Sequence, residues 1–214
     1  LNWKKQFSDD LHLNTSLHYV RSYTDVDLLH VYENTYSAQQ NISYLNDIGA
    51  KVELDWMPSE YHHISAGAGF TEYLLDSRRN HSSEPETDNL FKLKYDISEV
   101  ALHAADEISI SNWFKTNIGL RYSLTTQGET TYHSIEPRAA LRFQLNDATA
   151  LKFSYTEMSQ AIHLLRAHYV DLPMSSWLPS TNEIPPMRSR QIAGGVYANL
   201  PHNISLSIEG YWKN

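Results

Sequence analysis

Apolar and polar residues alternate along most of this chain with a period of two. Between Leu11 and Tyr19 the odd positions are leucine, threonine or tyrosine, and the even positions are histidine, asparagine or serine. The same alternation recurs over residues 48–56, 64–71, 117–124, 141–145, 151–156 and 204–209. Because successive side chains of a strand point to opposite faces, the pattern predicts about ten strands, each with one apolar and one polar face.

Connections of two lengths separate these strands. Short turns rich in turn-forming residues are expected at 8–10, 58–60, 111–112, 146–147 and 201–203. Longer polar connections are expected at about 24–42, 77–92, 126–133 and 158–188. Short turns on one side and long loops on the other are typical of a transmembrane β-barrel. The predicted fold is therefore all-β, an antiparallel meander of strands of roughly 9–15 residues that forms part of such a barrel.

Aromatic residues favour lipid as the surroundings of the apolar face. One group lies close to the short turns: Trp56, Tyr61, Trp113, Phe114 and Phe143. A second group lies near the opposite strand ends: Tyr19, Phe70, Tyr73, Tyr122 and Tyr155. Eight steps of a strand cover roughly 26 Å, or roughly 20 Å of height at a tilt of about 40°. That height is near the apolar band of about 25 Å that lies between two aromatic girdles.

The expected faces follow from the alternation. The apolar set should point to the convex side: Leu13, Leu17, Val52, Leu54, Leu120, Leu141, Phe153 and Leu206. The charged set should point to the concave side: Lys51, Glu53, Arg121, Arg142, Lys152 and Glu209. In a barrel the concave side is the lumen, so Lys51, Glu53, Arg121 and Arg142 are candidate lumen-lining charges.

Composition narrows the classes of protein. The 214 residues have a mean hydropathy of −0.48 and no apolar run near the roughly 18 residues of a membrane helix. The chain has no cysteine, and its net charge of −8 argues against a nucleic-acid partner. Residues 1–7 lack the apolar segment of a signal peptide, which an exported protein needs. We therefore expect an interior piece of a longer protein.

Catalytic and metal-binding signatures are not found in the sequence. It contains no Gly-x-Ser-x-Gly, no P-loop and no Gly-x-Gly-x-x-Gly motif, so we expect neither an enzyme nor a cofactor. Eleven histidines invite a metal hypothesis. However, His62 and His63 point to opposite faces of a strand, while His12 and His18 share a face but lie roughly 20 Å apart. Neither pair can hold zinc without distant partners, and we expect no metal site.

Several short motifs carry a family resemblance. They are Asp106-Glu107, Gly119-Leu120-Arg121-Tyr122 and Pro137-Arg138, each in or beside an alternating strand. With them the chain resembles the β-barrel domain of TonB-dependent outer-membrane receptors. Residues 160–180 hold Gln-Ala-Ile-His-Leu-Leu and Trp-Leu-Pro-Ser, which resembles the Bacteroidetes-type receptors. Such barrels have 22 strands around a plugged lumen, so the plug domain and the remaining strands are expected outside this chain.

The resemblance implies a function and its partners. The parent protein would be an active transport receptor of the Gram-negative outer membrane, embedded in the lipid bilayer. It would bind a scarce nutrient of the siderophore, cobalamin, glycan or peptide class, and the TonB complex would act on it through the plug. Lumen charges would contact the plug. The apolar, proline-containing loop at 158–188 would face outside or dip into the mouth. Its candidate ligand contacts are His163, His168, Tyr169 and Trp177.

Two alternatives remain open from the sequence. A complete barrel of eight or ten strands, acting as an adhesin or a structural porin, would require the first and last strands to pair. A soluble β-sandwich used as a binding module would require the leucines to pack together inside a sealed core.

Overall fold

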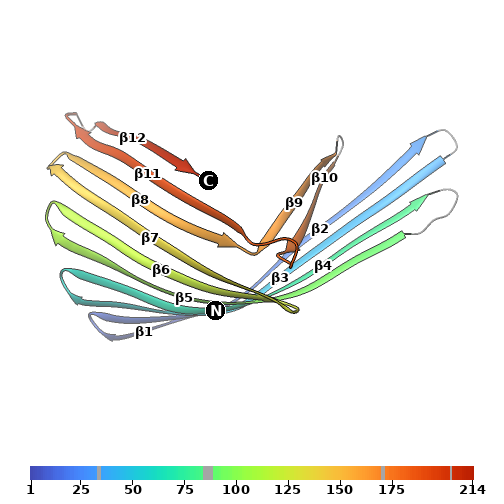
Figure 1. The fold of residues 1–214 in the computed structure, drawn as a ribbon, viewed down its shortest axis with the longest axis horizontal. Helices are drawn as coiled ribbons and strands as arrows, with labels where there is room; N and C mark the ends of the chain where they lie inside the picture. Colours follow the sequence, from blue (N-terminus) through green and yellow to red (C-terminus); the bar gives the residue numbers. More distant parts are fainter. Residues whose placement is uncertain (33–34, 84–88, 170–171, 203) are drawn as a thin grey trace.

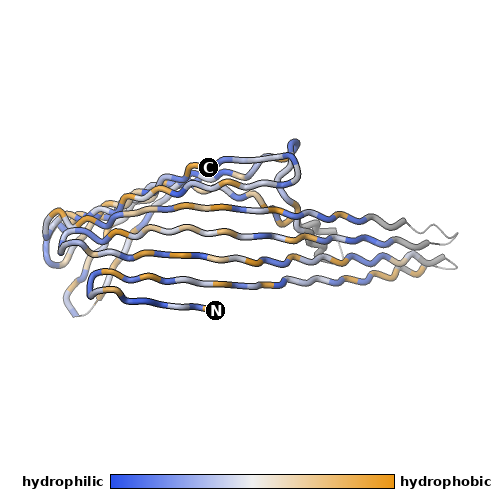
Figure 2. The backbone as a smooth tube through the Cα atoms, turned by 90° about the horizontal axis from the view of Figure 1, so that it is seen from below, coloured by the Kyte–Doolittle hydropathy of each residue, from blue (hydrophilic) through white to orange (hydrophobic). Residues whose placement is uncertain are grey.

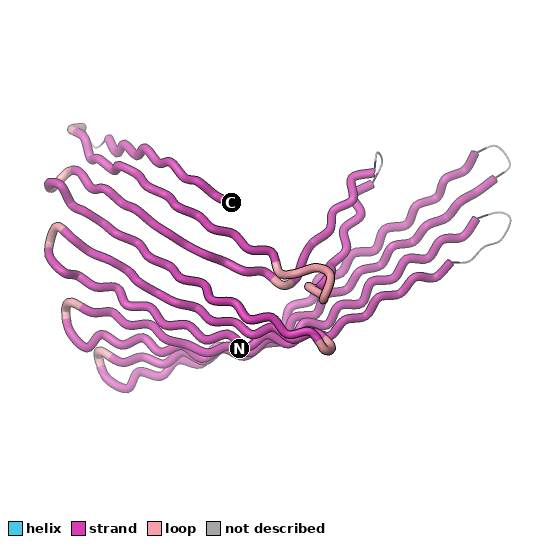
Figure 3. Tube along the Cα trace, in the orientation of Figure 1, coloured by secondary structure: helices cyan, strands magenta, loops and turns pink. Residues whose placement is uncertain are grey.

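A computed structural model describes residues 1–32, 35–83, 89–169, 172–202 and 204–214, which form strands and turns (Figures 1 and 3). The strands are β1 (Asn2–Ser8), β2 (Leu11–Tyr32), β3 (Thr35–Ser59), β4 (His62–Ser83), β5 (Asn89–Ser111), β6 (Phe114–Gln127), β7 (Thr130–Asn146), β8 (Thr149–Gln160), β9 (Ile162–Tyr169), β10 (Leu172–Pro179), β11 (Met187–Leu200) and β12 (Ile204–Lys213).

Ten strands form one curved antiparallel sheet in the order β1-β2-β3-β4-β5-β6-β7-β8-β11-β12. Strands β9 and β10 form a separate hairpin between β8 and β11. The predicted meander is confirmed, because the strands of the large sheet pair in their order along the chain, with the β9–β10 hairpin inserted between β8 and β11. Among the described residues, β1 and β12 are the two edges and do not pair with each other. The chain thus forms neither a small closed barrel nor two stacked sheets.

Cross-strand register assigns the faces, since directly paired residues lie on the same side of a sheet. Leu13 pairs with Leu54, and Val52 pairs with Ala68, all on one face. That face is open: the exposed fraction is 52% for Leu17 and 51% for Leu120. The sheet is curved (Figure 1), and the opposite face lies on the inside of the curve. Polar side chains of this face line grooves that are described below. The apolar face is therefore the convex one, as the alternation predicts.

The apolar band on the convex face ends along an oblique line. On β4 the boundary falls between Phe70 and Glu72, whereas on β11 it falls between Ile192 and Arg190. The register connects Ile192 of β11, strand by strand, to Ile64 of β4. Ile64 lies six positions closer to the short turns than Phe70, so the boundary moves six positions between β4 and β11. Six residues rise roughly 20 Å, and five strand spacings cover roughly 24 Å. The band is level only if the strands tilt by about 40°, which is the tilt of membrane barrels. Figure 2 shows hydrophilic and hydrophobic residues alternating along these strands.

Aromatic rings gather at the turn end of this band. The rings of Phe114 and Phe143 stack with centroids 4.8 Å apart, and Trp113 lies 5.7 Å from Phe114. Such rings suit a membrane interface, where one part of the ring is apolar and another meets water. At the other end of the band the prediction for Tyr73 is wrong. Its register partners are Asp47 and Ile97, which places Tyr73 on the concave face.

Strands β2 to β5 have 22, 25, 22 and 23 residues, longer than predicted. Most of the polar connections expected at 24–42 and 77–92 are continuations of these strands. Beyond the apolar band the convex positions of β4 and β5 become charged, at Asp76, Arg78, Lys92 and Lys94, while strand-to-strand hydrogen bonding continues. In this extension Arg78 donates two hydrogen bonds to Asp76, of 2.9 and 2.8 Å, and these hold the pKa of the Asp76 carboxyl below its usual value.

The connection expected at 126–133 is a tight turn. Only Gly128 and Glu129 separate β6 from β7, and Gly128 has a φ of 57°. A positive φ at the first of two central residues is the pattern of a type II′ hairpin turn, which matches the twist of the flanking strands. Glycine adopts this conformation without a steric cost, because it has no Cβ.

The β9–β10 hairpin packs on the concave side of the sheet (Figure 1). Strand β10 contacts β3 and β4. On the concave face of β4 and β5, Leu75 and Ile97 are each only 1% exposed. An open sheet cannot bury its own side chains so fully, so this small apolar core requires the covering hairpin. Most of the connection expected at 158–188 is thus a hairpin that packs on the sheet, in the part of it that the structure describes.

Candidate functional site: the concave wall

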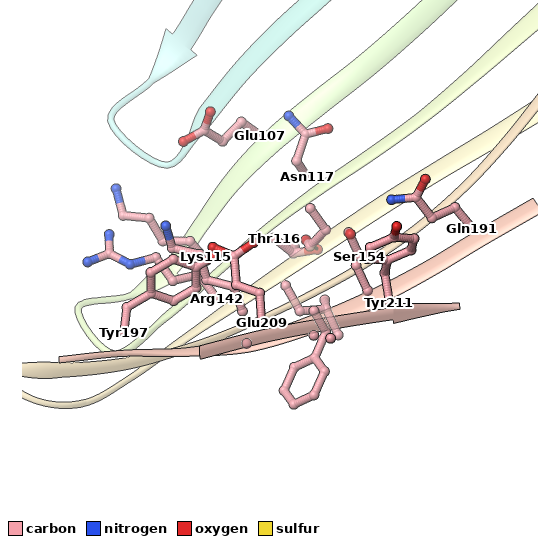
Figure 4. Close-up of a pocket in the computed structure, with 18 residues that line it drawn as sticks. Glu107, Lys115, Thr116, Asn117, Arg142, Ser154, Gln191, Tyr197, Glu209 and Tyr211 are labelled. Carbon is pink, nitrogen blue, oxygen red and sulfur yellow. Dashed lines mark hydrogen bonds between the residues drawn. The ribbon is translucent and has the colours of Figure 1, made fainter. Parts of the chain in front are cut away.

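The concave face carries two grooves that divide its charged residues into two groups. The first groove has a volume of about 540 Å³ and lies over β2 to β7. Its lining includes Lys51, Glu53, His103 and Arg121. The second has a volume of about 450 Å³, lies over β5 to β12 near the short turns, and is lined by Arg142 (Figure 4). The four candidate lumen-lining charges thus all lie on the concave wall, but in different surroundings.

The first groove contains a network of ion pairs. Arg121 on β6 lies directly opposite Glu136 on β7. The Arg121 guanidinium contacts the Glu99 carboxylate at 2.6 Å and the Glu136 carboxylate at 3.5 Å. Arg138 contacts Glu136 at 3.7 Å, and Ser123 donates a hydrogen bond of 3.4 Å to it. Glu136 is only 1% exposed, so its charge depends on these partners. We name Glu99, Arg121, Glu136 and Arg138 the paired network.

A close packing arrangement extends this groove toward β3. The ammonium group of Lys51 lies 2.5 Å from the Glu53 carboxylate, and His103 lies 3.9 Å from the same carboxylate. The His103 ring occupies the space above Gly67 on β4. A Cβ added to Gly67 would lie 2.5 Å from the ring and 2.7 Å from the carbonyl oxygen of Val52. Glycine at this position lets the imidazole lie flat on the sheet.

The second groove holds three cations in a row. Lys115 on β6 pairs directly with Arg142 on β7, and Arg142 pairs directly with Lys152 on β8. We name these three residues the cationic row. Lys152 lies 4.1 Å from the centre of the Tyr197 ring, and the Tyr197 hydroxyl donates a hydrogen bond of 2.8 Å to Glu209. Figure 4 shows Lys115 and Arg142 on the same side of the sheet as Tyr197 and Glu209.

The candidate ligand residues lie on the β9–β10 hairpin. His163 is buried, and its Nε2 lies 3.0 Å from the Ser180 hydroxyl. Trp177 pairs with Leu164 across the hairpin and is half-buried. The backbones of His168 and Tyr169 lie near the tip of β9, and their side chains lie outside the described part of the structure. Among the described side chains, the hairpin therefore places His163 beside Ser180 and Trp177 opposite Leu164.

Two hydrogen bonds join the connection between β10 and β11 to β7. The Tyr132 hydroxyl on β7 donates to the carbonyl oxygen of Thr181 at 2.6 Å, and Thr130 donates to the Asn182 side chain at 2.7 Å. Sequence reasoning missed Thr130 and Tyr132, because they fall in a segment that was expected to be a loop.

Neither a metal centre nor a membrane helix is found in the part of the chain that the structure describes. Its His, Asp and Glu side chains form no group of three or more that could hold a metal ion. None of the described residues belongs to a helix long and apolar enough to cross a membrane.

The geometry defines a class: a segment of β-barrel wall with an apolar outer band and a charged inner face. The family described as TonB dependent receptor-like, beta-barrel, matches residues 1–214, and the chain belongs to this family. A search of curated proteins finds no match.

Solved structures share the fold at low sequence identity. The ferric yersiniabactin uptake receptor FyuA from Yersinia pestis has a TM-score of 0.75 and 9% identity, over 99% of this chain and 34% of that one. The ferric-catecholate import receptor Fiu from E. coli K12 has a TM-score of 0.72 and 11% identity, over 98% and 39%. The RagAB peptide transporter has a TM-score of 0.63 and 12% identity, over 98% and 29%. The chain thus spans about a third of the length of these structures.

Sequence reasoning also missed several residues of the concave wall. Glu99 and Glu136 were not singled out, although each lies in an alternating run and on the polar side. Their role depends on which arginine lies opposite, and that requires the register of three strands. Lys115 was missed because it follows a short turn directly, where the alternation has barely begun.

Proposed function

We propose that this chain forms ten strands of the barrel wall of a TonB-dependent outer-membrane receptor that imports a scarce nutrient. One observation carries the proposal: the curved sheet has an apolar convex band, level at a tilt of about 40°, and a charged concave wall. A soluble protein rarely exposes an apolar surface of this extent. Membership of the receptor family supports the same reading. The plug domain and the remaining strands would belong to the rest of the receptor.

The proposed location is the outer membrane of a Gram-negative cell, with the lipid bilayer against the convex face. The five predicted short turns would lie on the periplasmic side and the long extensions of β2 to β5 outside, which is the usual polarity of these barrels. Lys51, Glu53, Arg121 and Arg142 would face the plug, and the TonB complex would act through that plug. These contacts are expectations from the family resemblance and the position of the charges on the concave wall.

The β9–β10 hairpin is the proposed ligand-facing element. It follows the end of β8 that lies away from the short turns and packs inside the curve, where a nutrient entering from outside would meet it. Trp177 supplies an aromatic surface for stacking, and His163, His168 and Tyr169 are the other candidate contacts. The substrate belongs to the siderophore, cobalamin, glycan or peptide class. The related structures named above include receptors for ferric siderophores and a peptide transporter, which supports that range.

The test uses the full-length receptor in cells that depend on it for the nutrient. Residues 162–185 are deleted, assembly of the barrel is verified, and ligand binding and energised uptake are measured separately. Loss of binding with an intact barrel is expected. Normal binding and uptake by the deletion variant would show that the hairpin packs on the wall and does not contact the ligand. Uptake that continues after removal of TonB would overturn the importer assignment itself.

A further inference from the structure

One carboxylate lies on the convex side of the wall, among apolar residues. Asp106 on β5 pairs directly with Ile64 on β4 and with Ile118 on β6, so it lies inside the convex apolar band. Trp56 on β3 pairs with Ile64 and belongs to the aromatic group near the short turns, which puts Asp106 toward that end of the band. Ionisable side chains inside a membrane are rare and usually have a functional role.

Asp106 forms a pair with His62 that still lacks hydrogen-bond donors. The Nδ1 atom of His62 on β4 lies 2.7 Å from Asp106 Oδ2. Because a carboxylate only accepts, Nδ1 is the donor, and the Nε2 atom of a neutral imidazole is then an acceptor. Asp106 Oδ1 is buried and has no donor among the described residues. The two side chains are 42% and 28% exposed, so a donor can reach the pair from the convex side.

The surroundings of the pair favour a positively charged ligand. His62 also lines a groove of about 500 Å³ at the short turns. The other titratable residues of this groove are Asp10, Glu60, His63 and Glu107, and no lysine or arginine lines it in this described part of the chain. Three carboxylates without a permanent cation attract a positive group and repel a phosphate.

Two small side chains next to Asp106 leave room for a hydrocarbon chain. Ala66 on β4 and Ala104 on β5 pair directly, with Leu54 on one side of them and Leu120 on the other. Ala104 is two residues from Asp106 and lies on the same face. The convex surface is therefore lower here than at the two leucines, and an acyl chain that extends from Asp106 into the band packs on the alanines.

We propose that the His62–Asp106 pair binds the primary ammonium group of a phospholipid in the periplasmic leaflet of the membrane. The ammonium group donates N–H to the Asp106 carboxylate and to His62 Nε2, and an acyl chain lies over Ala66 and Ala104. A lysine of a neighbouring membrane protein has the same charge, but a face turned to the bilayer always meets lipid, and the two alanines suit a hydrocarbon chain. The inference goes beyond import and rests on the proposed function only for placing the convex face against the bilayer.

The experiment offers the purified full-length receptor equal amounts of phosphatidylethanolamine and phosphatidylcholine with identical acyl chains. Native mass spectrometry then counts the lipids that stay bound. The two headgroups carry the same charges, but the trimethylammonium group of phosphatidylcholine has no N–H to donate. We expect the first bound lipid of the wild type to be the ethanolamine lipid by a ratio on the order of tenfold.

Substitution of the carboxylate tests whether Asp106 is the cause of that preference. In Asp106→Asn the ratio of the two lipids should fall to parity. The matched control is Asp96→Asn, on the same strand and face but beyond the other end of the band, where Asp96 pairs with Leu74. It should keep the wild-type ratio. Equal ratios in the wild type and Asp106→Asn would overturn the inference, and so would a preference for phosphatidylglycerol when that anionic lipid is added.

A second variant tests the site without changing a polar group. Ala104→Leu fills the low surface beside Asp106, so the amount of bound ethanolamine lipid should fall severalfold. The control is Ala198→Leu, which enlarges another convex alanine, opposite Leu206 on the far side of the sheet. If both variants retain as much ethanolamine lipid as the wild type, no acyl chain packs at Ala104 and the site is not the one proposed.

These results are separable from the proposed function. TonB-dependent uptake by a receptor that retains the two lipids equally would remove the lipid site and leave the importer. An Asp106-dependent preference for the ethanolamine lipid, in a receptor whose uptake ignores TonB, would retain the lipid site and remove the importer.

Discussion

The paired network and the cationic row lie on the same face of neighbouring strands, yet their charges are arranged in opposite ways. In the network, Arg121 lies opposite Glu136, which is buried and neutralised within the wall. In the row, Arg142 lies between two lysines. Strand β7 contributes Glu136 to the network and Arg142 to the row. The two arginines therefore differ in the residues that the strand register places opposite them: a glutamate for Arg121 and two lysines for Arg142. The wall therefore neutralises its own charge in the paired network, whereas in the cationic row three cations lie side by side with no carboxylate in ion-pair contact among the described residues.

The largest expected effect comes from breaking the paired network. Arg121→Met removes the closest cation from Glu136 and leaves Arg138, at 3.7 Å, as the main countercharge. Removing one member of a buried ion pair typically destabilises a protein by about 3–5 kcal/mol. The denaturation midpoint of the full-length receptor in lipid or detergent should fall accordingly. A midpoint equal to that of the wild type would mean that Glu136 does not need Arg121.

A second substitution tests whether the convex face contacts lipid, by placing a cation at a position next to Arg121 in the chain. Leu120→Arg puts a cation on the convex face, beside Arg121, which is accommodated on the concave face. At mid-membrane depth this should cost about 2–4 kcal/mol. The measurement is the unfolding midpoint in lipid, with Leu120→Met as the control for packing. An unchanged midpoint for the arginine variant would count against lipid contact at this band.

A smaller effect is expected from filling the space under His103. Gly67→Ala brings a methyl group against the ring and the Val52 carbonyl oxygen, so the imidazole must move away from Glu53. Crowding of this kind costs about 1–3 kcal/mol. Gly69→Ala is the control, because a Cβ there has its nearest neighbour at 3.8 Å. The unfolding midpoints of the two variants should differ, and equal values would show that the ring moves freely.

The smallest effect on barrel stability is expected in the cationic row. Arg142→Gln removes the central charge and relieves two repulsive contacts, so barrel unfolding should change by less than about 0.5 kcal/mol, or become slightly less favourable. The denaturation midpoint should therefore fall for Arg121→Met and stay nearly unchanged for Arg142→Gln. A loss of stability as large as that of Arg121→Met would show that the row is already neutralised within the wall.

The sequence predicted most of the fold because the membrane imposes a strict alternation. Leu120 and Arg121 were assigned to opposite faces correctly, and the short turns were found. The extensions of β2 to β5 were missed because the apolar convex pattern stops there: on β4, Asp76 and Arg78 take the convex positions, whereas Leu75 lies on the concave face. The candidate site was harder to predict. Arg121 and Arg142 are alike as single residues, and only the register of adjacent strands, which alternation does not determine, separates them.

The position of the β9–β10 hairpin has a consequence for the order of assembly. Every other connection in the sheet has five residues or fewer, whereas 26 residues lie between Gln160 and Met187, the first pair that joins β8 to β11. Closing a loop of this length costs about 2 kcal/mol more entropy than closing a two-residue turn. A hairpin that forms early shortens the effective loop, and the hydrogen bond from Tyr132 to Thr181 holds β11 near its place. The β8–β11 seam is therefore the step at which folding of this wall should be slowest, and the hairpin is the element that speeds it.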